Sequence, residues 1–263
     1  MPSLRHEEVP LYAPERHQQI LDTARSQGRV EVAGLARELS VTPETVRRDL
    51  TALERRGALR RVHGGAIPVE RLGFEQGVAD REGKAADEKE RIARAALDEL
   101  PDGGSIILDA GTTTVRLAEL LPLDRELTVV THSIPVAAIL VSLPNISLHL
   151  LGGTVRHRTL AAVGEWTRAQ VSELYVDVAF MGTNGVSVER GLTTPDVAEA
   201  RVKRALMEAS RRTVVLADHS KFGREEFARV APLSLVDTII TDSGIDQDLT
   251  EDLEAAGPRM VIV

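Results

Sequence analysis

The N-terminal part of the chain carries apolar residues at helical spacing, interrupted by turn residues. Apolar side chains between 20 and 24 repeat with the period of a helix that begins near Pro14, and Gly28 stands where a C-terminal cap belongs. A short extended stretch at 30–32 and a second helical pattern at 33–39 follow. The pattern therefore predicts two helices with a short strand between them.

The segment after residue 40 predicts a third helix and a hairpin. Thr42 is a favoured N-cap residue and Pro43 suits the first helical position, so a helix should run to about residue 56. Val46, Leu50 and Leu53 repeat at i, i+4 and i+7 and should face inward. Residues 60–69 are expected to form two short strands around a pair of glycines.

Beyond residue 84, apolar runs alternate with amphipathic runs. The expected strands are 106–109, 127–131, 147–151, 176–181, 213–217, 236–241 and 260–263. The expected helices are 86–100, 115–120, 134–143, 164–172, 197–210 and 247–256. Such alternation predicts an α/β domain with a mostly parallel sheet covered on both faces.

These patterns divide the chain into four parts. We expect an N-terminal tail at 1–13, a winged helix-turn-helix domain at 14–69, a linker at 70–84 and an α/β domain at 85–263. The linker is assigned where apolar residues no longer recur at a regular spacing and the content of charged residues and glycine rises. A length of 263 residues suits one small and one medium domain.

Composition narrows the class of protein. The chain has no cysteine, which excludes disulfides, Cys-based zinc sites and thiol nucleophiles. No apolar run approaches the ~20 residues that span a bilayer, and the charged first ten residues do not resemble a signal peptide. We therefore expect a cytoplasmic protein with no membrane partner, no metal site and no cofactor.

The net charge of −8 hides an asymmetry. Residues 1–68 carry a net charge of +2, whereas residues 69–263 carry −10. Within the first part, residues 42–64 hold six arginines, three acidic residues and one histidine. Because salt screens charges beyond about 8 Å, DNA would meet this local positive field rather than the average.

The third helix has the features of a DNA-reading element. If Val46, Leu50 and Leu53 face inward, short polar residues and arginines on the same helix must face outward. An arginine there can pair with guanine, and the helix N-terminus can hold a backbone phosphate. The hairpin, with Arg61 and His63 near its glycines, resembles a wing. The residues expected to contact DNA are Thr42, Thr45, Arg47, Arg48, Thr51, Arg61 and His63.

The alternative is that these arginines form only a solvated helix face, which is the better assumption for an arbitrary helix. Here the short capped turn and the basic hairpin occur together with them, which favours DNA binding. Asp49 and Glu54 remain candidates to neutralise some of the arginines.

The clearest small-molecule signal is the run Asp109–Thr114, which directly follows a strand and precedes a helix. Gly111 should permit a tight turn, and three threonine hydroxyls stand beside the free amides of a helix N-terminus. This pattern predicts a phosphate cradle, although a simple N-cap is an equally good explanation of the run alone. It is neither a Walker A loop nor a dinucleotide fingerprint.

Other polar residues fall where loops should follow strands, at the edge of the sheet where ligands bind. Glu199 and Lys203 are four apart on one helix and by themselves suggest a surface pair; Lys221 could be an ordinary loop lysine. A dianionic ligand nevertheless needs local cations, and these lysines could supply them. The residues expected to bind the ligand are Asp109, Gly111, Thr112, Thr113, Thr114, Thr131, His132, Ser133, Thr183, Asn184, Glu199, Lys203, Asp218 and Lys221.

The segments VTPETVRRDL and GALRRVHGGA resemble the N-terminal domain of the DeoR family of bacterial regulators. The resemblance implies that Thr45, Arg47 and Arg48 read or clamp DNA. It also implies a homodimer or homotetramer on repeated half-sites of a double-stranded operator.

The segments LGGTVR, GLTTPDVAEARVKRA and ADHSKFG resemble the sensor domain of the same family, which is similar in fold to ribose phosphate isomerases and coenzyme A transferases. The isomerases carry an Asp-Gly-Ala-Asp motif where this chain has Met181 to Asn184. Isomerisation needs a carboxylate base, so this departure implies binding without turnover. His132 stands where the family more often has Asn, which leaves the choice of ligand open.

The sequence thus predicts a transcription regulator, expected to be a repressor, controlled by a small phosphorylated sugar or polyol. The alternatives are a sugar phosphate isomerase with a DNA-binding appendage and an architectural DNA binder with a merely structural C-terminal domain.

Overall fold

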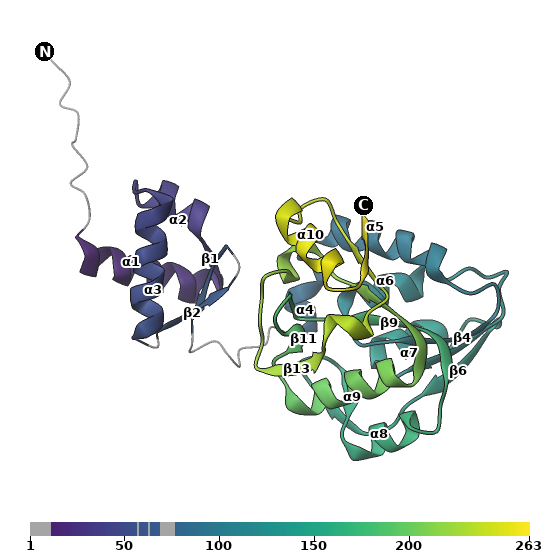
Figure 1. Ribbon diagram of the computed structural model, residues 1–263. Coiled ribbons are helices and arrows are strands. Elements are labelled where there is room, and N and C mark those ends of the chain that lie inside the picture. Colours follow the sequence, from purple (N-terminus) through teal and green to yellow (C-terminus); the bar gives the residue numbers. More distant parts are fainter. Residues whose placement is uncertain (1–11, 57, 63, 69–76) are drawn as a thin grey trace, which may run out of the picture. The chain divides into compact units, whose positions relative to one another are not determined.

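The computed structural model describes residues 12–56, 58–62, 64–68 and 77–263. The chain divides into two compact units, Met1–Phe74 and Glu75–Val263. Each unit has its own hydrophobic core. Figure 1 labels their helices and strands. Among the described residues, no helix is long and apolar enough to cross a membrane.

The first unit is a winged helix-turn-helix. Its helices are α1 (Ala13–Gln27), α2 (Val32–Glu38) and α3 (Pro43–Arg55). Its strands are β1 (Val30–Glu31), β2 (Leu59–Val62) and β3 (Gly65–Pro68). The strands form an antiparallel sheet in the order β1-β3-β2, in which β2 and β3 are the expected hairpin.

Two capping residues predicted from the sequence mark the end of α1 and the beginning of α3. Gly28 has a φ of 84°, a left-handed conformation that favours glycine, and its N–H donates to the carbonyl of Ala24 at 2.7 Å, which closes α1. The side chain of Thr42 accepts a hydrogen bond from the backbone N–H of Thr45 at 3.2 Å, so Thr42 caps α3. Both ends therefore have partners for backbone groups that a helix leaves open.

The inward face of α3 is apolar with one exception. Val46, Leu50 and Leu53 are buried in the core of the first unit, as predicted. Asp49 is buried beside them, and its carboxylate accepts hydrogen bonds from Arg16 at 2.5 Å and 3.1 Å. Asp49 therefore anchors α3 to α1.

The surroundings of Asp49 keep it charged. His17 Nε2 lies 2.9 Å from the Asp49 carboxylate, in addition to the two bonds from Arg16. Burial raises the pKa of Asp49, but the hydrogen bonds of Arg16 and His17 outweigh burial and lower it overall. The carboxylate is thus occupied by α1 and does not neutralise the arginines on the outer face of α3.

The second unit is built on a seven-stranded sheet in which all neighbouring strands are parallel. Its order is β15-β14-β12-β9-β4-β5-β6. The strands are β4 (Gly104–Leu108), β5 (Leu127–Thr131), β6 (Ile146–Leu150), β9 (Val176–Gly182), β12 (Ser210–Leu216), β14 (Thr238–Thr241) and β15 (Arg259–Ile262). All seven strands expected from the sequence are present.

Helices cover both faces of this sheet. Successive strand residues point to opposite sides, so apolar strands present apolar side chains on both faces. Ile106 and Leu108 pack with the helices of one face, whereas Ile107 packs with those of the other. The first face carries α5 (Ala86–Ala96), α6 (Thr112–Glu119) and α7 (Ile134–Leu140). The second carries α8 (Glu165–Val171), α9 (Val197–Glu208) and α10 (Gln247–Ala255). The predicted α/β class is confirmed.

Several short elements escape the sequence pattern. One small antiparallel sheet joins β10 (Gly185–Ser187), β11 (Gly191–Thr194) and β13 (Ala228–Ala231), and a second joins β7 (Thr154–Arg156) and β8 (Ala161–Val163). In the described part of the chain, short 3-10 helices span Leu97–Glu99, His219–Lys221 and Leu233–Leu235. Elements of three or four residues are too short to show a period.

A further helix, α4 (Val78–Glu82), lies within the stretch that the sequence assigns to the linker. It packs on α6, and the N–H of Val78 donates to the carbonyl of Arg158 at 2.9 Å. Five residues give no clear amphipathic pattern, so tertiary contacts rather than periodicity reveal that α4 belongs to the second unit.

The role of Asp49 gives a stability prediction. Asp49→Asn should destabilise the first unit by about 1–3 kcal/mol, because it weakens the hydrogen bonds that join α1 to α3. Hydrogen–deuterium exchange of the full chain should show faster exchange in peptides from 13–68, with peptides from 104–263 unchanged. Glu44→Gln is the control, since Glu44 makes an exposed pair with Arg47 and its loss should change little. Unchanged exchange in Asp49→Asn would contradict the anchoring role.

Candidate functional site

Five of the seven residues expected to contact DNA lie on α3 or β2. Arg47 and Arg48 are exposed on the outer face of α3. The side chain of Arg61, on β2, donates to Thr51 Oγ1 at 3.3 Å, and Thr51 in turn donates to the carbonyl of Arg47 at 2.8 Å. The wing strand and the outer face of α3 therefore form one polar surface.

Other members of the predicted set have internal roles or cannot be placed. The hydroxyls of Thr42 and Thr45 lie 3.0 Å apart within the cap of α3. Arg47 makes an exposed pair with Glu44 at 3.1 Å, which DNA phosphate could replace. The backbone N–H of Arg61 donates to Glu54, so Glu54 supports the wing. His63 lies outside the described residues.

The second unit has a pocket at the carboxyl edge of its sheet. It opens where β4, β9 and β12 end, and β4 and β9 are the neighbours between which the strand order reverses. Ligands of open α/β sheets bind at such a point. The hollow encloses about 410 Å³, including its open mouth. It is lined by Arg81, Ala110, Gly111, Thr112, Thr113, Thr114, Gly182, Thr183, Asn184, Lys203, Leu216, Ala217, Asp218 and Lys221.

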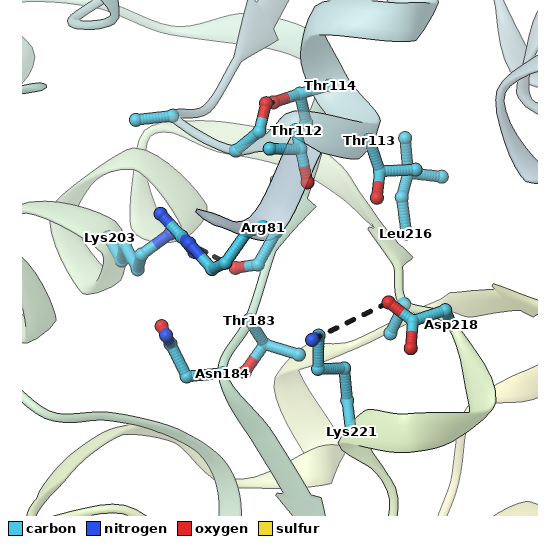
Figure 2. Close-up of a pocket in the computed structure, with 14 residues that line it drawn as sticks. Arg81, Thr112, Thr113, Thr114, Thr183, Asn184, Lys203, Leu216, Asp218 and Lys221 are labelled. Atoms are coloured by element: carbon cyan, nitrogen blue, oxygen red, sulfur yellow. Dashed lines mark hydrogen bonds and ion pairs between the residues drawn. The ribbon is translucent and has the colours of Figure 1, made fainter. Parts of the chain in front are cut away.

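The threonine run forms the first turn of α6 on one side of the pocket (Figure 2). Thr114 donates its hydroxyl to the carbonyls of Asp109 at 2.7 Å and Gly111 at 2.9 Å, so it fixes the turn. The hydroxyls of Thr112 and Thr113 make no hydrogen bond among the described residues. These two hydroxyls and the free amides of the first turn can donate to an anion.

Gly111 contributes by close approach rather than by a special turn. Its φ of 176° is extended backbone that any residue adopts, so the sequence-based reason for this glycine was wrong. A Cβ at Gly111 would lie 4.0 Å from the Cα of Gly182 and 3.3 Å from Thr114 Oγ1. Two glycines facing each other let the ends of β4 and β9 approach closely beneath the pocket.

Asp109 lies under the pocket and is fully buried. It forms an ion pair with Lys203 and accepts the N–H of Gly182 at 2.8 Å. His132 Nε2 lies 2.9 Å from the other carboxylate oxygen. Burial raises the pKa of Asp109, but Lys203 and His132 outweigh it and bring the pKa to about 2. Asp109 therefore organises the floor of the pocket as an anion.

Lys203 is held by several acceptors at once. Besides Asp109, its ammonium donates to the carbonyl of Gly182 at 3.1 Å and lies 3.8 Å from Glu199. Glu199 also forms an ion pair with Arg156 of β7. Glu199 and Lys203 are 1 % exposed, so the surface pair considered from the sequence is in fact buried. Lys203 lines the pocket, but its charge is balanced from within the protein.

The Thr131–Ser133 segment does not line the pocket. The hydroxyl of Thr131 donates to the carbonyl of Leu108 at 2.7 Å, and Ser133 caps α7. His132 Nδ1 lies 2.8 Å from the carbonyl of Ala162. These residues support the site from behind.

Thr183 and Asn184 line the pocket from the end of β9. The Thr183 hydroxyl faces two backbone carbonyls, those of Gly185 at 2.9 Å and Thr193 at 3.2 Å. Asn184 Oδ1 accepts from the hydroxyl of Thr194 at 3.0 Å, which leaves the amide NH₂ of Asn184 available. A neutral donor, the amide of Asn184, therefore lies at this end of β9.

Lys221 and Asp218 face the threonines from the other side of the pocket (Figure 2). The ammonium of Lys221 lies 3.6 Å from the Asp218 carboxylate, which also accepts hydrogen bonds from Ser220. Burial lowers the pKa of Lys221, and Asp218 acts in the opposite direction. The Lys221 side chain is 21 % exposed, so it can reach a ligand.

Arg81 is the charged pocket residue that sequence reasoning missed. It comes from α4 and its Nε is buried without a hydrogen-bond partner. It makes no ion pair among the described residues. Its guanidinium can therefore offer a positive charge that forms no salt bridge with any carboxylate that the structure describes. A lone arginine in an irregular charged stretch gave no signal.

Lys89 holds Arg81 in place. Lys89 is 3 % exposed, and its ammonium donates to the carbonyls of Arg81 and Lys84 at 2.5 Å each. Burial lowers the pKa of Lys89 to about 8. The chain contains only four lysines, and two line the pocket while Lys89 fixes the backbone of Arg81. No cluster of His, Asp or Glu among the described residues could hold a metal ion.

A helix-turn-helix unit joined to an α/β unit with a pocket lined by cationic and hydroxyl side chains is typical of one class of protein, the ligand-responsive transcription regulators. Residues 84–243 match the family model for the DeoR C terminal sensor domain, and residues 16–71 match that for the DeoR-like helix-turn-helix domain. The chain belongs to the DeoR family of transcription regulators, as its motifs predicted.

Curated relatives agree along nearly the whole chain. The HTH-type transcriptional regulator GlpR of Haloferax volcanii is 39% identical over 94% of this chain and 96% of its own length. The glycerol-3-phosphate regulon repressor of Escherichia coli K12 is 34% identical over 87% of this chain and 90% of its own length. Both are named as regulators, which confirms that the chain is a transcription regulator rather than an enzyme.

Solved structures with a similar sheet include the ribose 5-phosphate isomerase A of Methanocaldococcus jannaschii. It is 20% identical, covers 53% of this chain and 55% of its own, and has a TM-score of 0.40. This resemblance concerns the fold of the second unit alone.

The buried ion pair under the pocket predicts a stability change. Asp109→Asn should destabilise the second unit by roughly 3–5 kcal/mol, because it leaves Lys203 buried opposite a neutral amide. Urea unfolding at pH 7, followed by hydrogen exchange in peptides from 104–263, measures this. Asp124→Asn is the matched control at an exposed position.

The pH dependence follows from the lowered pKa of Asp109. Its folded value of about 2 lies below the unfolded value of about 3.9, so its contribution is full above pH 4. It is lost as the pH falls from about 4 to about 2. Wild type should lose more stability across that window than Asp109→Asn; equal losses would show that Asp109 is not held charged.

Proposed function

We propose that this protein is a repressor whose operator affinity is controlled by a small phosphorylated sugar or polyol bound in the pocket of the second unit. The observation that carries the proposal is the pocket itself. It joins two free threonine hydroxyls and a helix N-terminus to Arg81 and Lys221. Amide, hydroxyl and cationic donors around one hollow are the set that a phosphate monoester requires.

The existing ion pairs of the pocket residues indicate which cations are available to bind the phosphate. Lys203 is already paired with Asp109, so it adds little net charge. Arg81 has no ion pair among the described residues, and Lys221 shares Asp218 at 3.6 Å. We therefore assign the phosphate to Arg81, Lys221 and the first turn of α6. Asp218 and Asn184 are then left to bind the hydroxyls of the sugar or polyol.

The name of the Escherichia coli relative, a glycerol-3-phosphate regulon repressor, supports this class of effector. Direct control of an operator places the protein in the cytoplasm, and paired half-sites on DNA call for a homodimer or homotetramer.

The first unit would bind the operator through the outer face of α3. Arg47 and Arg48 are exposed cations of that face, and Arg61 joins it from the wing. An effector that binds one arrangement of the heads better than another needs a coupling of only about 1–3 kcal/mol to change operator affinity 5- to 150-fold.

The effector proposal predicts a thermal shift. The protein is heated with a panel of phosphorylated sugars and polyols, including glycerol phosphate, and with their unphosphorylated forms. A compound at ~100 times its dissociation constant should add about 2.7 kcal/mol to the stability of the second unit. In Lys221→Met the shift should shrink, while Lys84→Met, an exposed lysine outside the pocket lining, should keep it.

Two results would count against this assignment. A full shift in Lys221→Met would remove Lys221 from the site. A shift from an unphosphorylated compound but not from its phosphate ester would show that the threonine turn does not bind phosphate.

The operator proposal predicts a separate loss. Arg47→Ala should weaken binding to DNA selected from a random duplex library by the wild type about 5- to 150-fold, since one good base contact contributes about 1–3 kcal/mol. Fluorescence anisotropy measures the affinity, and Arg94→Ala, an exposed arginine of α5, is the control. The effector shift should be unchanged in Arg47→Ala. If operator affinity and effector shift fell together, the two units would not have the separate roles proposed.

A further inference from the structure

One stretch of the second unit has an unusual composition. Residues 127–155 contain no Asp, Glu, Lys or Arg, although 27% of the chain is charged. They form β5, α7, β6 and the start of β7. Burial explains the absence of charge in β5, which lies between β4 and β6. It does not explain α7 and β6, which expose side chains to solvent.

The exposed side of α7 is apolar. Ile134 is 43% exposed and Val141, just after the helix, is 73% exposed. With Ala138, also exposed, they lie at i, i+4 and i+7 and therefore on one face. A surface helix usually carries polar or charged residues on its solvent side.

The neighbouring strand β6 extends this apolar surface. It is the outer strand of the seven-stranded sheet (Figure 1), and no strand pairs with its free edge in the described part of the chain. β6 contacts α7, and its last residue, Leu150, is 55% exposed. Proteins usually guard such an edge with lysine, proline or a bulge, because its open N–H and C=O groups bind another strand.

The opposite edge of the same sheet shows the usual protection. There β15 carries Arg259, whose guanidinium pairs with Glu99 and is more than half exposed. The two edges of one sheet therefore differ in charge, and only β6 has neither a charged nor a proline residue in the strand.

We propose that the free edge of β6 and the exposed face of α7 form the interface between two copies of this chain. A surface without charge is complementary to another such surface and offers no cation to nucleic acid. Antiparallel pairing of β6 with its own copy about a two-fold axis would satisfy the open backbone groups of both strands. The inference deepens the proposed function, and rests on it only for the need of two DNA-reading units.

The test measures molecular mass by sedimentation velocity on the full chain. Wild type should sediment at twice or four times the chain mass of 28.6 kDa at micromolar concentration. Val141→Lys and Leu150→Lys should each weaken association at least 100-fold, because each would place an unpaired charge in the interface. Leu235→Lys, at a 46% exposed site outside this surface, is the matched control and should keep the wild-type mass.

A second measurement uses the absence of cysteine in the chain. Ser147→Cys, Leu148→Cys and His149→Cys are oxidised mildly, with Leu235→Cys as control. Facing residues of antiparallel strands lie about 4.5–5.5 Å apart at Cα, a separation that a disulfide spans. At least one of the three should give a covalent dimer.

The outcomes separate this inference from the proposed function. A monomeric wild type, or wild-type mass in both lysine variants, would overturn the interface. Cross-linking in none of the three cysteine variants would overturn the pairing of β6 with its copy. Neither measurement uses DNA or effector, so these results would leave the thermal shift and the operator affinity to be judged by themselves.

Discussion

The second unit depends on a single buried charge. Asp109 is fully buried where β4 ends, and an isolated carboxylate there would be very unfavourable. It is stabilised by Lys203 from α9, His132 after β5 and the N–H of Gly182 at the end of β9. Three elements far apart in the sequence are thereby fixed at one point, directly beneath the pocket. Because Asp109 already balances the charge of Lys203, an anion in the pocket has to be bound by other cations.

Those cations come from the periphery of the unit. Arg81 belongs to α4, the first described element after the stretch that joins the two units, and its backbone carbonyl is held by Lys89. Lys221 follows β12 and shares Asp218. A ligand that binds both cations would contact the helix nearest in sequence to the DNA-reading unit.

Each of the two units contains a buried carboxylate that is paired with side chains of the same unit. Asp49 joins α3 to α1 through Arg16 and His17, and this leaves the arginines on the outer face of α3 free of that carboxylate. In each unit a buried acid is satisfied from inside, and exposed cations remain for an anionic partner. The membership of the chain in the DeoR family agrees with this division between operator and effector. The uncharged surface at β6 is where we propose that a second copy of the chain binds.

The sequence alone determined the fold class, all seven strands of the main sheet, the helix-turn-helix and the threonine turn. These features are local: strand and helix periods, caps such as Thr42 and Gly28, and short motifs are visible in consecutive residues. The tertiary structure decided which charges are already paired. It buried Lys203 and Glu199, placed Thr131 and Ser133 behind the pocket, and brought Arg81 into it. Charge pairing depends on contacts between residues as distant as Asp109 and Lys203, and no period along the chain records such contacts.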